Sequence, residues 1–393
     1  MTSKLFKKYA EVYKNTLLKD VIPFWEMHSL DQVNGGYYTC LNRQGVVYDT
    51  DKFVWLQGRQ AWVFSMLYNK LESKQDWFEI SKLGVDFLLK HARSPSGDFY
   101  FALNAAGDPL IKPYNIFSDC FAAMALSQYA KAAKNDNIRA VAVEIYRNIL
   151  SRRSNPKGVF NKHTTTRPLK DFALSMILSN LVLEMEDVLS RKEVDETLDV
   201  CITEVMGTFL NEETGLILEY VSEEGSFVDC FEGRLINPGH GLEAMWFMLD
   251  IGVRRNDQDL IQKAILVMLS ILEFGWDQQH GGLFYFMDLK GHPPQQLEWD
   301  QKLWWVHSES LVALAKAFSL SKDQAIWDWY QKVHSYTWGH FPDPEYGEWY
   351  GYLNRQGKPH LSLKGGKWKG CFHLPRALFQ CWQIFEKLAI DSK

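Results

Sequence analysis

Two hydrophobic patterns alternate along the chain. Short apolar and aromatic runs between glycines and polar turns recur six times, a pattern typical of β-hairpins. The runs are GGYYTCLNRQG from Gly35, GDFYFALNAAG from Gly97, GVFNKHTTT from Gly158, GLILEYVSEEG from Gly215, GGLFYFMDLKG from Gly281 and GEWYGYLNRQG from Gly347. Successive marker glycines (36, 97, 158, 215, 282 and 347) are 61, 61, 57, 67 and 65 residues apart. This near-constant period indicates stacked supersecondary units.

Between the hairpins, apolar residues recur at the i, i+3, i+4 spacing of amphipathic helices. The predicted helices are Phe53–Glu72, Asp76–Arg93, Phe117–Ala133, Ile138–Arg152, Leu169–Asp187, Lys192–Leu210, Leu235–Arg254, Asp257–Phe274, Lys302–Leu320, Asp323–Trp338 and Cys371–Leu388. The last helix has no following partner, and the helix Leu5–Val21 at the start of the chain supplies it. The sequence therefore predicts an all-α protein, an (α/α)6 barrel of six helix pairs with short β-hairpins between units.

An open α-solenoid is the alternative, because it too has a sequence period. Solenoid repeats usually span about 33–47 residues and carry no aromatic hairpins. The first helix after each hairpin is also the more apolar one, as an inner ring requires. No Pro/Ser-rich linker interrupts the chain, so we expect a single domain over residues 1–393.

Composition narrows the class of protein further. The chain has 393 residues, 46% of them apolar, and a formal net charge of −5 without a Lys/Arg block, which disfavours a nucleic-acid partner. Nothing approaches the roughly 20 consecutive apolar residues of a membrane helix. The six cysteines form no C-x-x-C pair and are expected to be reduced thiols of a cytoplasmic protein. The 14% aromatic content predicts either a large core or surfaces on which flat ligands stack.

Charged and polar residues recur near the start of the first helix of several repeats. Arg59, Asp119, His240, Glu309 and His373 each follow a turn glycine by 12 to 18 residues. Equivalent positions in a closed ring lie at the same end of the barrel. Taken singly, such a histidine is more often a helix cap, and a glutamate more often pairs with a lysine. Their convergence on one end of one ring favours a functional site.

The residue types at this end suit acid–base chemistry. His240 and Glu243, like His373 and Arg376, are three residues apart and share a helix face, so Glu243 is expected to orient or charge the imidazole of His240. Two imidazoles can act as acid and base at neutral pH. Arg59 and Arg376 can stabilise developing negative charge. Faces for a sugar ring are offered by Trp304, Trp305 and Trp368. No HExxH or comparable spacing appears, so we expect no metal site.

Several motifs resemble the N-acylglucosamine 2-epimerase family over essentially the whole chain, nearest to its bacterial, cyanobacterial-type members. They are DTDKFVWLQGRQAW, PYNIFSDCFAAMA, RLINPGHGLEAMW, WDQKLWWVHSESL and KGGKWKGCFHLPRA. The resemblance implies an (α/α)6 barrel, commonly a homodimer, that interconverts N-acetylglucosamine and N-acetylmannosamine, with His240 and His373 transferring protons. It places Arg59, Glu243, Glu309 and Arg376 at the substrate. We add Asn115, Asp119, Trp304 and Trp368 as expected substrate contacts.

The resemblance further implies that the chemistry needs no cofactor and that ATP activates the enzyme without being consumed. No Walker motif is present, since the GGKWKG run at residues 365–370 has the wrong spacing. A basic turn from Asn155 departs from the other hairpins and is the second candidate for a nucleotide site. Lys157, Lys162 and Arg167 are its expected ATP contacts, and an ordinary surface loop is the alternative.

Other functions on the same scaffold remain open at this point. A cellobiose 2-epimerase or a mannose (aldose–ketose) isomerase would also use paired histidines, although the motif strings favour an N-acyl sugar. A glycoside hydrolase or lyase is less favoured, because hydrolysis needs two carboxylates flanking the glycosidic oxygen. A non-catalytic binding protein has no reason to place two histidines beside two arginines. We expect the imidazoles of His240 and His373 to face each other across a pocket at the hairpin-distal or loop-rich end. Each should be within hydrogen-bond reach of a carboxylate or carbonyl, with Glu243 or Glu309 as the favoured partner.

Overall fold

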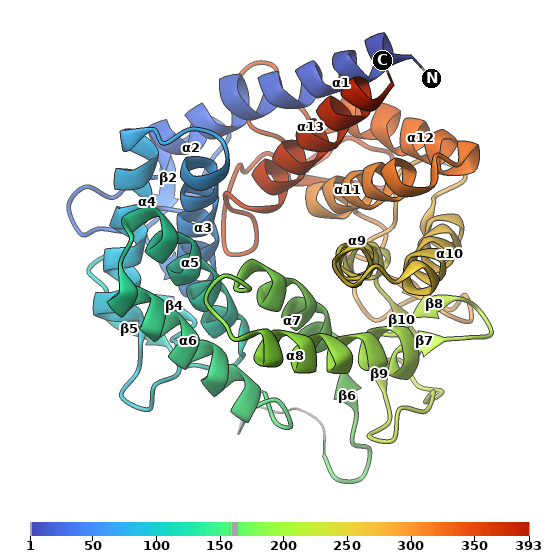
Figure 1. Cartoon of the computed structure of the whole chain (residues 1–393), viewed down its shortest axis with the longest axis horizontal. Coiled ribbons are helices and arrows are strands. Elements are labelled where there is room, and N and C mark those ends of the chain that lie inside the picture. The colour runs from blue at the N-terminus through green and yellow to red at the C-terminus, as the bar shows by residue number, and fades with distance from the viewer. Residues whose placement is uncertain (1, 157, 159–163, 393) are drawn as a thin grey trace.

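The computed structural model describes residues 2–156, 158 and 164–392. Within these ranges the helices form two concentric rings (Figure 1). The inner ring consists of α3 (Val54–Lys70), α5 (Phe117–Ala133), α7 (Ala173–Glu184), α9 (Pro238–Arg255), α11 (Trp304–Ser321) and α13 (His373–Asp391). The outer ring consists of α1 (Ser3–Thr16), α4 (Gln75–Phe87), α6 (Asp136–Ser151), α8 (Arg191–Thr203), α10 (Gln258–Gly275) and α12 (Gln324–His340). The predicted (α/α)6 barrel is confirmed.

Burial explains which helices take the inner positions. Every residue of α3 from Leu56 to Leu67 is buried, because inner helices contact neighbours on all sides. The outer helix α6 buries only a stripe, namely Ala142, Ile145, Tyr146 and Ile149, spaced as one helix face. Each outer helix packs on the inner helix that precedes it in the chain, except for α1, which packs on α13. Among the described residues, no helix is long and apolar enough to span a bilayer.

The two ends of the chain complete the ring. The helix α1 continues through a π-helical turn, η1 (Leu17–Val21), into α2 (Ile22–His28), so the N-terminal helix extends beyond the predicted Leu5–Val21. Ser3 Oγ donates to Ala389 O at 2.6 Å, which places the two termini side by side (Figure 1). The predicted packing of the N-terminal helix beside the last one is confirmed.

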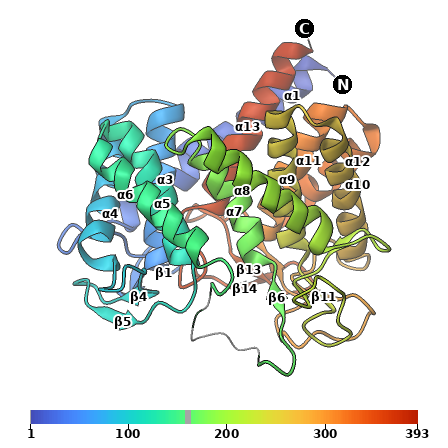
Figure 2. The same cartoon turned by 60° about the horizontal axis from the view of Figure 1, so that its bottom comes forward.

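Short strands join neighbouring units at one end of the barrel, below the helices in Figure 2. Hairpins within a unit are β1 (Cys40–Leu41) with β2 (Val47–Asp49), β4 (Ala102–Leu103) with β5 (Pro109–Ile111), β7 (Leu210–Asn211) with β8 (Leu216–Ile217), and β13 (Tyr352–Leu353) with β14 (Pro359–Leu361). Strands that lead into an inner helix pair with the next unit: β3 (Lys52–Phe53) with β4, β6 (Lys170–Asp171) with β9 (Tyr220–Val221), β10 (Leu235–Ile236) with β11 (Met287–Asp288), and β12 (Lys302–Leu303) with β13. These pairings fix the starts of the inner helices relative to one another.

Five predicted inner helices begin too early: α13 begins at His373 rather than at Cys371, and the other four follow short strands. The predictions began at residues 53, 169, 235 and 302, whereas α3, α7, α9 and α11 begin one to four residues later, after the strands β3, β6, β10 and β12. The residues of these strands are apolar or lie against buried carboxylates. The hydrophobic pattern of each strand therefore continues into that of the following helix, and the boundary between them is not visible in the sequence. Two outer helices end in π-helical turns, η2 (Leu88–Ala92) after α4 and η4 (Glu204–Thr208) after α8.

Candidate active site

The two candidate histidines lie at the N-terminal ends of α9 and α13, the two inner helices that flank α11. The strands and loops gather at this end of the barrel (Figure 2). His240 is in the first turn of α9, and its backbone N–H donates to the capping side chain of Asn237 at 3.2 Å. His373 is the first residue of α13, and Arg376 lies one turn further on. Both histidines are therefore fixed by helix starts at the loop-rich end, as expected.

His373 belongs to a buried ion-pair network. Its Nδ1 lies 2.7 Å from Glu309 Oε1, and the same oxygen accepts from Arg376 Nη2 at 2.8 Å. Trp246 Nε1 donates to the other Glu309 oxygen at 2.9 Å. The expectation that Glu309 holds one histidine is confirmed for His373. With Nδ1 carrying the proton that faces Glu309, the Nε2 lone pair of neutral His373 is free to act as a base.

The electrostatic surroundings keep His373 neutral. Burial, then the guanidinium of Arg59 and that of Arg376, hold the pKa of His373 well below its usual value, although Glu243 acts in the opposite sense. Glu309 does not reverse this effect, because Arg376 already balances the charge of the oxygen that His373 contacts.

His240 is held by a carboxylate that the sequence analysis missed. Its Nδ1 lies 3.0 and 3.1 Å from the two oxygens of Glu219. Burial alone would lower the pKa of His240, but the carboxylate of Glu219, with smaller contributions from Glu243 and Asp171, raises it above its usual value. Glu243 does not orient the ring of His240, because it accepts instead from Arg376 Nη2, but its charge is one of those that raise the pKa of His240.

Trp305 connects the two histidines. Its ring centroid lies 5.3 Å from that of His240 and 5.6 Å from that of His373. A Cβ on Gly239 would lie 2.7 Å from the Trp305 ring, so only glycine at this position lets the start of α9 lie so close to Trp305 on α11. This close approach explains the Pro-Gly-His-Gly start of α9. The structure therefore brings His240 and His373 together around one aromatic ring.

Arg59 contributes a cation that the described residues leave without a carboxylate partner. Its guanidinium lies 4.1 to 4.8 Å from the ring centroids of Phe121, Trp55 and Phe372, and its buried Nε has no hydrogen-bond partner. Burial lowers the pKa of Arg59 to about 9, so the group stays cationic at neutral pH. A buried cation with unsatisfied donors is suited to bind an oxygen that gains negative charge.

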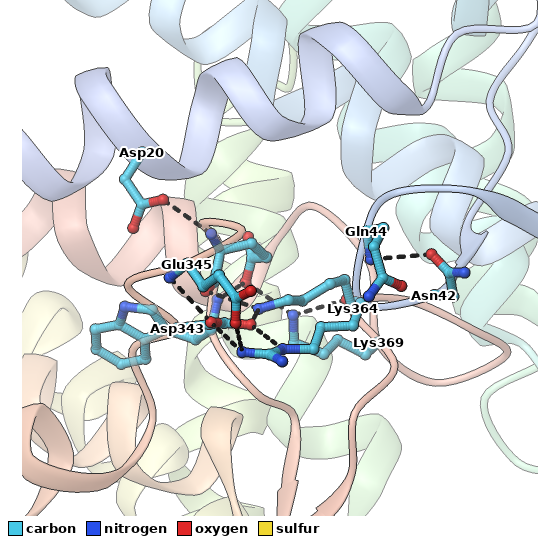
Figure 3. A network of polar contacts seen from close by, with 10 residues as sticks. Asp20, Asn42, Gln44, Asp343, Glu345, Lys364 and Lys369 are labelled. Atoms are coloured by element: carbon cyan, nitrogen blue, oxygen red, sulfur yellow. Dashed lines mark hydrogen bonds and ion pairs between the residues drawn. The ribbon is translucent and has the colours of Figure 1, made fainter.

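A loop of buried lysines positions His373. Lys369 Nζ donates to Glu348 Oε1 at 2.8 Å, and Trp25 Nε1 donates to the other Glu348 oxygen at 2.7 Å. Lys364 Nζ lies 2.9 Å from Asp343 Oδ2. Figure 3 shows Lys364 and Lys369 in this network, with Asp20 reaching it from the N-terminal helix. Residues 362–371 are thus tied to both ends of the chain just before α13 begins.

The other predicted substrate residues lie apart from the ion-pair network of His373. Asn115 lies two residues before α5 and accepts from Phe117 N at 3.1 Å, and Asp119 accepts from Arg152 Nη2 at 2.5 Å. Burial raises the pKa of Asp119 to about 6, although Arg152 opposes this shift. Trp304 is buried with its ring centroid 6.4 Å from that of His373, whereas Trp368 is 53% exposed and packs against Trp55. Their contact with substrate stays a prediction.

Two of the predicted nucleotide contacts, Lys157 and Lys162, lie outside the described residues. Arg167 Nη2 lies 3.2 Å from Glu232 Oε2, so this cation already has a carboxylate partner. Nearby, Lys170 and Arg153 both bind Glu204. The described cations of this region thus form ion pairs with the protein's own carboxylates, and a nucleotide site here stays a prediction.

One cluster of side chains has the spacing of a metal site. Ligand atoms of Glu243, Glu309 and His373 lie within 4.8 Å of one another. Arg376 Nη2 bonds to a carboxylate oxygen of both glutamates, so a guanidinium already supplies the positive charge between them. The donor set therefore fits an ion-pair network better than a metal centre, and the predicted lack of a metal stays a prediction.

Comparison with known proteins gives a consistent result. A family model described as N-acylglucosamine 2-epimerase matches residues 36–377. The N-acylglucosamine 2-epimerase of Mus musculus is 40% identical over 400 residues, covering 98% of this chain and 93% of the mouse protein. The structure of a cellobiose 2-epimerase from Bacillus thermoamylovorans B4167 has a TM-score of 0.83 at 20% identity, covering 97% of this chain and 100% of that one. A D-mannose isomerase structure has a TM-score of 0.82 at 15% identity, covering 96% and 98%. At such low identities the two structures show a shared fold alone.

Proposed function

The chain belongs to the N-acylglucosamine 2-epimerase family, and we propose that its two buried histidines interconvert N-acetylglucosamine and N-acetylmannosamine. It is a carbohydrate isomerase that inverts the configuration at C2. The observation that carries the mechanism is the pair of imidazoles around Trp305, each with Nδ1 on a different glutamate. Both therefore offer Nε2 for proton transfer.

The chemistry follows from the acidity of the sugar. The C2 proton of a closed pyranose is not acidic, so the ring must open to expose the C1 aldehyde. One imidazole then removes the C2 proton, giving an enolate, and the other returns a proton to the opposite face. Because His373 is held neutral and His240 is biased toward its protonated form, the pair already contains one base and one acid. We infer that this chemistry needs no cofactor.

The cationic side of the pocket suits the enolate. We propose that Arg59, whose Nε has no partner among the described residues, binds the oxygen at C1 as it gains charge. Arg376 donates to both Glu243 and Glu309, so its guanidinium holds these carboxylates in place beside the substrate. Trp305 and the exposed Trp368 are proposed to provide faces for the substrate, and contact of Trp304, Asn115 and Asp119 with it stays a prediction.

The 40% identity to the mouse enzyme over nearly the whole chain supports an N-acyl sugar over cellobiose or mannose. A hydrolase is disfavoured because Glu243 and Glu309 are both ion-paired to one arginine, which leaves neither as a free acid. The resemblance further supports a cytoplasmic homodimer activated by ATP, with residues 1–393 forming one domain. Six cysteines without disulfides are consistent with a reducing compartment.

The deciding experiment follows C2 by NMR in D₂O. Purified protein is incubated with N-acetylmannosamine, with and without ATP, and in parallel with cellobiose and with mannose. We expect N-acetylglucosamine that carries deuterium at C2, because the second imidazole delivers a solvent proton. Turnover of cellobiose or mannose instead, or a ketose product, would identify the scaffold's other activities. Sedimentation of the same sample at micromolar concentration tests the dimer.

A further inference from the structure

Glu219 is fixed between two inner helices. Its backbone N–H donates to Leu235 O at 3.2 Å, and its carbonyl accepts from Phe172 N at 3.0 Å. Leu235 lies just before α9, and Phe172 lies just before α7. The residue is buried, with 8% of its surface exposed. Its side chain therefore starts from a rigid point and has little freedom to leave His240.

The carboxylate of Glu219 is committed to His240. Both of its oxygens lie near Nδ1, at 3.0 and 3.1 Å, and no lysine or arginine in the described ranges forms an ion pair with it. Glu309 differs, because its Oε1 is shared between His373 and Arg376. The two histidines therefore have carboxylate partners of unequal effective charge.

The groups around the two rings continue this asymmetry. The titratable groups near His240 are Glu219 before β9, Asp171 on β6, Glu243 on α9, Tyr285 beside Trp305, and His373 on α13. Tyr285 is neutral, because burial and nearby carboxylates raise its pKa. His240 thus faces carboxylates from three elements, whereas His373 faces the guanidiniums of Arg59 and Arg376.

We propose that Glu219 is a positioning residue that keeps His240 protonated in the free enzyme, so that His240 is its acid and His373 its base. The proposal rests on the proposed epimerase function, which it deepens. Glu219 does not touch the sugar and acts only through the imidazole. It holds the Nδ1 proton, which directs the Nε2–H bond of the imidazolium into the pocket.

The proton balance has a consequence for turnover. In one direction, His373 Nε2 takes the C2 proton, and His240 Nε2 gives its own proton to the opposite face of the enolate. The product then leaves an enzyme with His373 protonated and His240 neutral. Before the same epimer reacts again, His373 must release its proton to water and His240 must take one up. Glu219 favours this return, because it stabilises the proton on His240.

The test is Glu219→Gln in the full-length protein. Glutamine keeps a carbonyl oxygen for the Nδ1–H bond but removes the charge. The titration of His240 is followed by imidazole NMR, with its resonance identified by its loss in His240→Asn. We expect the titration midpoint to fall by about 1–3 pH units, as for loss of an opposite charge in contact. The alkaline limb of kcat/KM should move to lower pH in both directions, while the acid limb stays in place.

The matched control is Glu223→Gln, the same change at an exposed position of the same hairpin, which should leave both curves unchanged. An unchanged His240 midpoint in Glu219→Gln overturns the proposal. If that variant does not fold, the unaltered protein still decides, since a His240 midpoint at or below that of a free imidazole also overturns it. These titrations need no substrate, so they stay informative even if no N-acyl sugar reacts and the proposed function fails.

Discussion

At the scale of single residues, the environment of each histidine depends on what its carboxylate partner binds besides it. Glu309 has a second cation, Arg376, on the oxygen that His373 contacts, whereas Glu219 has none among the described residues. The same type of contact therefore accompanies a lowered pKa at His373 and a raised pKa at His240. Such opposite shifts of two nearby groups are typical of an acid–base pair.

The pH dependence of catalysis should show this separation. In the proposed mechanism the active free enzyme has neutral His373 and protonated His240. Because the pKa of His373 is lowered, activity should be lost on acidification only below the usual histidine range. Because the pKa of His240 is raised, activity should be lost on the alkaline side only above that range. We expect a plateau of kcat/KM through neutral pH. A narrow optimum centred on the pKa of a free imidazole would contradict the assignment.

Removing either imidazole should abolish efficient turnover while the fold survives. We expect His240→Asn and His373→Asn each to lower kcat by about 10²–10⁴-fold, the usual contribution of general acid–base catalysis. Deuterium incorporation at C2, measured separately from each epimer, would show which face each histidine serves. His360→Asn, at an exposed position on β14, is the control and should keep full activity. Normal activity in His373→Asn would replace the two-base mechanism with a single base.

The sequence predicted the residues that repeat with the barrel and missed those that do not. His240, Glu309 and His373 follow their turn glycines at similar distances, and the structure brings them to one end. Glu219 precedes His240 by 21 residues and lies before a two-residue strand, without helical spacing or a motif. The pairing of β6 with β9 brings it to the start of α7, and the hydrogen bond from its N–H to Leu235 O brings it to the start of α9. Such long-range pairing is not readable from local pattern.

At the scale of elements, the same difference decides the helix boundaries. The outer helices were located well, because one polar face makes their period visible. The inner helices are buried on all sides, so their apolar pattern continues from the strands before them, and α7, α9 and α11 were predicted to begin early. A histidine also packs against a turn glycine in more than one unit, as His28 does against Gly45 and His340 against Gly357. The sequence analysis did not predict these contacts.

The loop that leads into α13 should depend on its buried lysines. Lys369 and Glu348 are each 1% exposed, so Lys369→Met leaves a buried carboxylate without its cation. We expect the free energy of unfolding to fall by about 3–5 kcal/mol, as for other broken buried pairs. Urea denaturation measures it. The double variant Lys369→Met/Glu348→Gln should recover part of the loss, and Lys367→Met, at an exposed position of the loop, should change little. Equal stability of the single and double variants would contradict this pairing.

At the scale of the whole molecule, the barrel is closed by segments from opposite ends of the chain. The helix α1 packs on α13, where Phe6 stacks on Phe385. It also contacts α12, where the hydroxyls of Tyr13 and Tyr330 lie 2.6 Å apart. Burial of Phe6 and Tyr13 contributes about 1.5–3 kcal/mol each. Closure of the barrel therefore depends on contacts between the first and last helices. It should not depend on which unit of the ring comes first along the chain.

A circular permutant tests this account of closure. Joining the termini by a short Gly/Ser linker and opening the chain between Glu72 and Ser73, in the exposed connection from α3 to α4, leaves every ring contact possible. We expect a cooperatively unfolding protein with epimerase activity, because this opening lies at the end of α3 away from the histidines. Deleting residues 2–16 from the linear chain should instead expose the apolar face of α13 and abolish cooperative unfolding, measured by circular dichroism in urea. A permutant that fails to fold, or a truncated chain as stable as the full one, would show that the ring is not closed in this way.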